Sequence, residues 1–321
     1  MNFNKYIARQ QPLPGLIGQE KVMMVYNLFT LAMAVVFYHE IAAGPAPILS
    51  RLAIIAFTVV LWRLYRNFPC DLTYVLRVYF QVALLSYWYP DIYNFAKLMP
   101  NVDPFFAHAD QLIFGCQPAL VFHQVLHGAF WSELFYMGYF SYYLMIVVTV
   151  VFATFCAYRH FDRTTTVILS SFAMYYVVFL FLQAGGPQFY YPKIGVDAAS
   201  AGVFPSIGDW FRLHPELNYD NGIHSGFFYS LVEKLQGSEF PIAAFPSSHV
   251  GLATVLMLLA RKMSKVLLLF FLPFYVVLCL STVYIGAHYG VDVIAGWGSA
   301  LLFYALSLRI YHSRYVHRPR A

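Results

Sequence analysis

Two histidines and one aspartate near the C-terminal end of the chain have the residue types and spacing of a catalytic set. His249 stands in the stretch FPSSHVG, and His288 and Asp292 stand in STVYIGAHYGVDVIAGW. His288 and Asp292 are four residues apart, so on a helix their side chains share one face and come within hydrogen-bonding reach. A carboxylate bonded to one imidazole nitrogen leaves the other nitrogen free as a nucleophile and stabilises the resulting cation. The second histidine can then protonate a leaving oxygen and later deprotonate an acceptor.

The positions of these residues favour an anionic substrate. His249 follows Pro246, Ser247 and Ser248, and serine is a preferred residue at a helix N-cap. His288 and Asp292 open a second apolar segment in the same way. Free backbone N–H groups in a first helical turn can hold a phosphate, so we expect two helix N-termini to face one anion. The competing interpretation of His288 and Asp292 alone is a helix-capping ion pair, and the second histidine argues against it.

The elements that must position these residues are membrane helices. The chain has 321 residues, of which 60% are hydrophobic and 11% charged, and its mean hydropathy is +0.60. A soluble protein would carry about 25% charged residues, so the sequence predicts an all-α, polytopic membrane protein. Eight apolar segments approach the roughly 20 residues that a spanning helix needs. They cover residues 22–43, 48–66, 72–95, 131–157, 164–184, 247–263, 265–286 and 288–310.

The charge distribution predicts the orientation. With eight spans, both termini and the loops after spans two, four and six lie on one side, which carries 14 of the 20 basic residues. These are Lys5, Arg9, Lys21, Arg63, Arg66, Arg159, Arg163, Arg261, Lys262, Lys265, Arg309, Arg314, Arg318 and Arg320. The positive-inside rule makes that side cytoplasmic. One helix crosses and another returns between His249 and His288, so both are expected on the extracytoplasmic face, periplasmic or lumenal.

Two stretches between the spans are expected to lie on the same face. Residues 103–129 have the pattern of an amphipathic helix in the membrane interface. The long loop at 185–245 is rich in aromatic residues, Pro and Gly, and loops of this length are usually functional or disordered. We expect it to form an ordered cap over the histidines. The sequence has no glycine-rich nucleotide loop, which argues against phosphoryl transfer driven by a nucleotide.

At the histidine motifs the sequence resembles the type 2 phosphatidic acid phosphatase superfamily, whose members show P-S-G-H and S-R-x-x-x-x-x-H-x-x-x-D. Here the first motif reads Pro246-Ser247-Ser248-His249, and the second reads Ser281-Thr282 followed by His288 and Asp292. The resemblance is close over Phe245–Trp297 and extends by topology over spans three to eight. It implies that His288 is the nucleophile forming a phosphohistidine, that Asp292 supports it, and that His249 is the acid and base. It implies no metal and no cofactor.

The same resemblance implies a division of the chain. Residues 1–70 would form an N-terminal segment with two additional transmembrane helices. Residues 71–310 would form the six-helix catalytic membrane domain, with the extracytoplasmic cap at 185–245. Residues 311–321 would form a basic cytoplasmic tail.

Departures from the family pattern indicate a branch. Thr282 stands where the motif has arginine, and the only Arg-Pro, at Arg318-Pro319, lies in the tail. The sequence pattern around His288 resembles that of inositol phosphorylceramide synthase, a sphingolipid phosphotransferase. A phosphodiester carries less charge than a phosphate monoester and needs fewer cations, which agrees with this branch. The implied reaction moves phosphoinositol from phosphatidylinositol to a ceramide-like lipid alcohol, with no nucleic acid and no obligatory protein partner.

Two other functions remain open. One is a phosphatase of lipid phosphates or polyprenyl diphosphates that uses the same histidines and aspartate, and the loss of the family cations argues against it. The other is a channel or transporter that reuses the fold. The intact set of His249, His288 and Asp292 argues against that function.

Five further residues are candidates for substrate binding. Ser247 and Ser248 would act at the helix start. Lys193 is the best remaining phosphate cation, with Arg212 next, although an interfacial anchor is an equally good reading of Lys193. Gln188 could bind polyol hydroxyls.

Several other polar residues favour simpler roles. Asp110 and Glu133 could reach a head group, but a solvated surface position is the better expectation. Arg77 is expected to snorkel toward the interface. His108, Asp110, His123 and His127 have the types of a metal cluster, but nothing in their spacing fixes one.

Overall fold

The computed structural model describes residues 4–216, 226–236 and 240–313, so residues 314–321 of the expected tail lie outside this part of the chain. Within the described ranges the regular structure is helical, apart from one isolated bridge between Asn101 and Gln183. The helices are α1 (Asn4–Ile7), α2 (Gly18–Val36), α3 (Tyr38–Ile41), α4 (Ala46–Asn67), α5 (Asp71–Ala83), α6 (Leu85–Asp91), α7 (Tyr93–Ala96), α8 (Asp103–Phe114), α9 (Pro118–Val125), α10 (Ala129–Phe155), η1 (Tyr158–His160), α11 (Phe161–Phe181), α12 (Pro187–Ile194), α13 (Val196–Ser200), α14 (Trp210–Leu213), α15 (Phe227–Gln236), α16 (Ser248–Met263), α17 (Lys265–Tyr284) and α18 (Gly290–His312).

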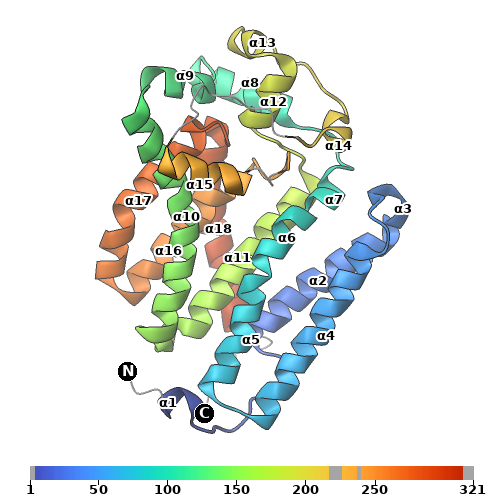
Figure 1. Ribbon diagram of the computed structural model, residues 1–321, viewed down its shortest axis with the longest axis vertical. Helices are drawn as coiled ribbons and strands as arrows, with labels where there is room; N and C mark the ends of the chain where they lie inside the picture. The colour runs from blue at the N-terminus through green and yellow to red at the C-terminus, as the bar shows by residue number, and fades with distance from the viewer. Residues whose placement is uncertain (1–3, 217–225, 237–239, 314–321) are drawn as a thin grey trace.

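Five helices in the described part of the chain are long and apolar enough to cross a membrane. They are α4, α10, Tyr158–Phe181, α17 and α18. This confirms the prediction of an all-α, polytopic membrane protein. The long helices run along the long axis of the molecule (Figure 1).

The other three predicted spans are helical but differ from a simple spanning helix. Helix α2 has 19 residues and begins with buried polar side chains. The segment predicted at 72–95 is divided into α5, α6 and α7 by single-residue turns at Leu84 and Ile92. Helix α16 has only 16 residues, fewer than the roughly 20 that a span needs. It packs against α10, α11, α17 and α18, so protein, more than lipid, surrounds it.

Two buried ion pairs join the N-terminal helices to the rest of the molecule. The Arg51 guanidinium donates to Asp91 at 2.5 and 3.3 Å, and the Arg77 guanidinium donates to Glu20 at 2.5 and 2.7 Å. The snorkelling predicted for Arg77 is therefore wrong, because its side chain is fully buried. Buried charges in proteins are paired and hydrogen-bonded, and the N-terminal segment supplies the partner for Arg77.

Two glycines let α16 and α18 approach closely near the histidines. A Cβ on Gly251 would lie 3.1 Å from the Gly296 carbonyl oxygen and would overlap the Tyr175 hydroxyl, and a Cβ on Gly296 would lie 2.8 Å from the Ser247 carbonyl oxygen. Larger side chains at either position would push the two helices apart. This crossing places the N-terminal turns of α16 and α18 beside each other.

Short helices cover the end of the molecule where α16 and α18 begin. Helices α8 and α9 come from the stretch predicted to lie in the interface, and α12 to α15 come from the long loop. Figure 1 shows α8, α9, α12 and α13 above the upper ends of α17 and α18, and α15 lying across α10. The histidines therefore lie beneath a layer of short helices.

Candidate active site

The three catalytic candidates are held by two helix starts and one turn. His249 is the second residue of α16, whose N-cap Ser247 accepts a hydrogen bond from the Val250 N–H at 3.3 Å. His288 lies in the turn between α17 and α18, and its backbone N–H donates to the Thr282 carbonyl at 3.0 Å. Asp292 is in the first turn of α18. All three side chains are buried.

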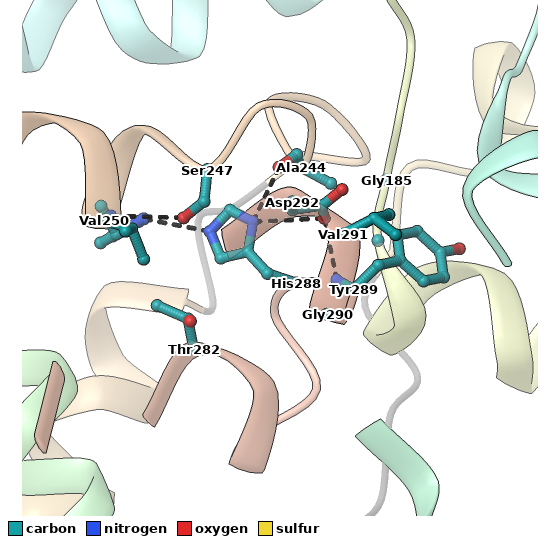
Figure 2. Close-up of polar contacts among 12 residues, drawn as sticks. Gly185, Ala244, Ser247, Val250, Thr282, His288, Tyr289, Gly290, Val291 and Asp292 are labelled. Carbon is teal, nitrogen blue, oxygen red and sulfur yellow. Dashed lines mark hydrogen bonds and ion pairs between the residues drawn. The ribbon is translucent and has the colours of Figure 1, made fainter. Parts of the chain in front are cut away.

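The tautomer of His288 is fixed by a backbone carbonyl. The His288 Nδ1 lies 2.7 Å from the carbonyl oxygen of Ala244, and because a carbonyl can only accept, Nδ1 carries the hydrogen. The carboxylate of Asp292 lies on the same side of the ring, with Oδ2 3.5 Å from Nδ1 (Figure 2). The predicted pairing of His288 with Asp292 is present, but the shorter bond goes to Ala244. The opposite ring nitrogen, Nε2, keeps its lone pair.

The free nitrogen of His288 faces the second histidine. Its Nε2 lies 3.4 Å from Nδ1 of His249, and the two ring centroids are 5.5 Å apart. A nucleophile and an acid or base at this separation can act on the same reacting group of a substrate. The structure therefore brings together the two histidines that the sequence predicted to share one face.

Tyrosines of α10 surround His249. The Tyr139 ring stacks on its imidazole with centroids 4.5 Å apart, Tyr142 lies at 4.4 Å, and Tyr143 meets it edge-on at 6.4 Å. The Nε2 of His249 is buried and has no hydrogen-bond partner within the described residues. Aromatic faces attract a cation, so the rings of Tyr139 and Tyr142 provide surroundings that favour a protonated imidazole at this position.

Asp292 connects the starts of α16 and α18. Its Oδ2 accepts the backbone N–H of Tyr289 at 2.8 Å, and its carbonyl oxygen accepts the N–H of Ser247 at 3.1 Å. Its Oδ1 is buried and has no partner in the described part of the chain. Asp292 thus holds the turn that carries His288 against the helix start that carries His249.

This arrangement lies inside a matched family region. The family model of the PAP2 superfamily, the type 2 phosphatidic acid phosphatase superfamily, matches residues 105–306, well over half of the chain. The chain belongs to the PAP2 superfamily. The matched region contains His249, His288 and Asp292, and membership supports a lipid phosphatase or phosphotransferase function. Comparisons with curated proteins and with solved structures found no match.

Two carboxylates of this PAP2 superfamily protein reach the site from α8. The fully buried Asp110 accepts the N–H groups of Gly290 and Val291, each at 2.8 Å, so the solvated position expected for Asp110 is wrong. Asp103, which the sequence analysis missed, accepts the N–H groups of Gly185 and Gly186 and the hydroxyl of Tyr289. A carboxylate in an apolar stretch needs a partner, and that rule, applied to residues 103–129, could have identified both.

The two helix N-termini of the PAP2 site are not equivalent. The carboxylate of Asp110 occupies the first N–H groups of α18, so the expectation that this helix start faces a substrate anion is wrong. In α16 the first intrahelical bond is from the Gly251 N–H to Ser247, so the N–H groups of Ser248 and His249 have no acceptor within their own helix. One helix start therefore remains suited to a phosphate.

The remaining predicted binding residues lie in the short helices of the cap. Gln188 is buried, and its backbone N–H donates to the Gly286 carbonyl at 2.8 Å, just before His288. The Lys193 ammonium lies 3.1 Å from the centroid of the Trp210 ring, and Arg212, also on α14, is exposed. The structure thus brings Ser247, Ser248 and Gln188 to the histidines and engages Lys193 with an aromatic ring.

The other polar candidates have structural partners. Glu133 accepts the N–H groups of Phe228 and Tyr229 at 3.0 and 3.1 Å and so caps α15. His108 packs edge-on against Phe204, and Nδ1 of His123 donates to the Ala119 carbonyl at 3.3 Å. Across the described ranges, no three His, Cys, Asp or Glu residues are grouped as metal ligands.

Proposed function

We propose that this protein transfers a phospho-head group, phosphoinositol from phosphatidylinositol, to a ceramide-like lipid alcohol through a phosphohistidine on His288. The observation that carries the proposal is the orientation of the His288 ring. Its Nδ1–H is bound to Ala244 and its free Nε2 faces His249 at 3.4 Å. A nucleophile with a fixed tautomer beside a proton donor is what covalent phosphoryl transfer needs.

In the first half of the reaction, Nε2 of His288 attacks the phosphorus of the donor. The bond from phosphorus to the diacylglycerol oxygen breaks, and His249 gives that oxygen a proton. The Ala244 carbonyl and the Asp292 carboxylate stabilise the positive charge on the imidazole through Nδ1. The enzyme then carries phosphoinositol on His288, and diacylglycerol leaves.

In the second half, His249 removes the proton from the hydroxyl of the lipid alcohol. The alkoxide oxygen bonds to the phosphorus, and Nε2 of His288 leaves with its electron pair. Because phosphorus on Nε2 occupies space that the His249 contact now fills, the two rings must separate when the donor binds. The resting contact at 3.4 Å is restored after each turnover.

The charges around the site favour a phosphodiester over a phosphate monoester. Three buried carboxylates, those of Asp103, Asp110 and Asp292, lie at or next to the His288 turn. Like charges in a low-dielectric region repel strongly, and this disfavours a dianionic phosphate more than a monoanionic diester. The buried arginines do not offset this charge. Arg51 is paired with Asp91 and Arg77 with Glu20, and both arginines are far from the histidine motifs in the sequence.

Burial of the site supports transfer over hydrolysis. His288 is 3% exposed, His249 is 8% exposed and Asp292 is 0% exposed. Water would hydrolyse a phosphohistidine, so a transferase must exclude water until the lipid alcohol arrives. The short helices above the site provide a cover of that kind.

We also propose that the active site faces the extracytoplasmic side and that the termini are cytoplasmic. Basic residues lie in the last turns of α4, α16 and α18, at Arg66, Arg261, Lys262 and Arg309. These turns are at the opposite ends of their helices from the histidines. Basic residues concentrate on the cytoplasmic side of membrane proteins.

A product-partition assay tests the proposed activity. Purified protein is incubated with head-group-labelled phosphatidylinositol, with and without ceramide, and the labelled products are separated. We expect the label to move mainly into a new sphingolipid, with little free inositol phosphate, and no transfer by His288→Ala. Rapid release of inorganic phosphate from phosphatidic acid, independent of any acceptor, would instead assign the protein to the phosphatase alternative.

A further inference from the structure

Helix α8 places two buried carboxylates against the segments that hold His288. Asp103 and Asp110 are seven residues apart, about two helical turns, so they lie on the same face of α8. Both side chains are fully buried. Neither carboxylate forms an ion pair with Lys or Arg in the described structure, and both accept hydrogen bonds from the site itself. Burying two charges in this way is costly unless each hydrogen bond is made.

Asp103 accepts four hydrogen bonds. Its Oδ1 receives the Gly186 N–H at 2.8 Å and the Tyr289 hydroxyl at 3.0 Å. Its Oδ2 receives the Gly185 N–H at 2.8 Å and the Asn101 side-chain amide at 2.6 Å. One carboxylate therefore holds both the glycine turn before α12 and the residue directly after His288.

These bonds continue along two paths to the Nδ1 edge of the His288 ring. On the first path, the Ala184 carbonyl next to Gly185 accepts the Ala244 N–H at 3.0 Å, and the Ala244 carbonyl accepts Nδ1–H of His288 at 2.7 Å. On the second path, the Tyr289 N–H donates to Oδ2 of Asp292 at 2.8 Å, and that oxygen lies 3.5 Å from Nδ1 of His288. The two paths leave Asp103 and meet again at His288, so they form a closed ring of hydrogen bonds and short chain segments.

The glycine turn has no room for a side chain at its closest point. Gly186 has a φ of +84°, and a Cβ there would lie 2.5 Å from the Ala287 carbonyl oxygen. The turn therefore packs directly on the residue that precedes His288. A shift of Asp103 would be transmitted to the backbone on both sides of His288.

Asp110 holds the next two residues of the chain, Gly290 and Val291. It holds the N–H groups of Gly290 and Val291 at 2.8 Å each, one on each oxygen. A Cβ on Gly290 would lie 2.6 Å from the Phe114 ring, so α8 also packs closely on the start of α18. Carboxylates of α8 thus hold positions 289, 290 and 291 directly, and Asp103 reaches Ala287 through the glycine turn.

We propose that Asp103 and Asp110 are positioning residues that hold Nε2 of His288 in line for attack on phosphorus. They act through Tyr289, Ala244 and the start of α18, and they do not touch the substrate. The inference rests on the proposed function, because it assigns these carboxylates a role in forming the phosphohistidine. A displacement of about 1 Å at a reacting group can lower a rate by about 10²-fold, so even small losses in this ring should be visible in catalysis.

The mildest test is Tyr289→Phe, which removes one hydroxyl from the ring and keeps the aromatic side chain. Its matched control is Tyr74→Phe, which removes a tyrosine–aspartate bond of the same kind, to Asp162 at 2.8 Å, at the opposite end of the molecule. Purified variants are mixed with head-group-labelled phosphatidylinositol without acceptor, and the rate of label transfer to protein is measured together with KM and thermal stability. We expect Tyr289→Phe to form the labelled enzyme about 10- to 100-fold more slowly, with KM and thermal stability close to those of Tyr74→Phe.

A second pair removes a carboxylate. Asp110→Asn keeps one acceptor oxygen but presents an NH2 group to the other backbone N–H, and its control is Asp71→Asn, whose carboxylate accepts the Tyr158 hydroxyl. Slow label transfer in both site variants with normal transfer in both controls supports the inference. Equal rates in site and control variants would overturn it while leaving the proposed function intact. Absence of enzyme-bound label in the wild-type protein, despite product formation, would overturn the phosphohistidine and this inference together.

Discussion

Nε2 of His288 lies 3.4 Å from Nδ1 of His249, although the two residues are 39 positions apart in the chain. The contact forms because α16 and α17 run out and back, and because Gly251 and Gly296 let α16 and α18 meet closely. The tautomer that directs Nε2 toward His249 is set by the Ala244 carbonyl. The pair therefore has the geometry of the nucleophile and proton donor in the proposed transfer reaction.

The two histidines should differ in what their loss does. His288→Ala should abolish both turnover and covalent labelling, because no other group supplies the nucleophile. His249→Ala should still form the labelled enzyme but about 10²–10⁴-fold more slowly, because His249 protonates the diacylglycerol oxygen in that same step. Single-turnover kinetics with labelled donor separate the two effects. Full activity of His288→Ala would eliminate the mechanism.

The pH dependence of stability should report on Asp110. Burial raises the pKa of Asp110 from its ordinary value of 3.8 to about 6, and the N–H groups of Gly290 and Val291 oppose part of that rise. The folded protein therefore favours the protonated form, so ionisation of Asp110 lowers the free energy of unfolding as pH rises from 3.8 to about 6, with no further loss above that.

Asp110→Asn cannot ionise and provides the comparison. The melting temperature of the wild-type protein minus that of Asp110→Asn should fall as pH rises between 3.8 and about 6 and then stay level. Thermal unfolding in detergent at a series of pH values measures this difference. A difference that increases with pH over the same window would show that the carboxylate is stabilised as an anion, against the expectation.

The ion pair between Arg51 and Asp91 should be important for stability but not for chemistry. Asp91→Ala would leave the fully buried Arg51 without its carboxylate, and breaking a buried pair from one side costs about 3–5 kcal/mol. Replacing both residues together with Arg51→Met and Asp91→Leu should recover much of that loss. Thermal unfolding measures both variants, and a fully stable Asp91→Ala would show that the pair contributes little.

The native cysteines can test the orientation. Cys116 lies between α8 and α9 at the end with the histidines, and the exposed Cys156 follows α10 at the other end. Each of the two is kept as the single cysteine of a variant in which the remaining cysteines are replaced by alanine. Cys116 should react with a membrane-impermeant maleimide from the extracytoplasmic side of sealed vesicles. Cys156 should react only after the vesicles are permeabilised. Reaction of Cys156 from the extracytoplasmic side, with Cys116 reacting only after permeabilisation, would reverse the proposed location.

The sequence predicted that His249, His288 and Asp292 come together because their signals are local. The spacing of His288 and Asp292 and the serines before His249 identify helix starts, and the apolar segments predict the helices that carry them. The Ala244 carbonyl was not predictable, because a backbone acceptor 44 residues from His288 has no side-chain signature. Asp110 and Arg77 were misassigned for a related reason. Whether a charged residue is solvated or paired depends on which helix packs against it, and the pattern of one segment does not show that.

The most direct test of the phosphohistidine is to find where the label goes. Purified wild-type protein is given head-group-labelled phosphatidylinositol without acceptor, quenched and digested at alkaline pH, and the labelled peptide is sequenced. The label should be on His288, and ceramide added before the quench should remove it with an equal gain of labelled sphingolipid. Label on a different residue, or sphingolipid formed at the wild-type rate with no label ever on the enzyme, would contradict covalent transfer through His288.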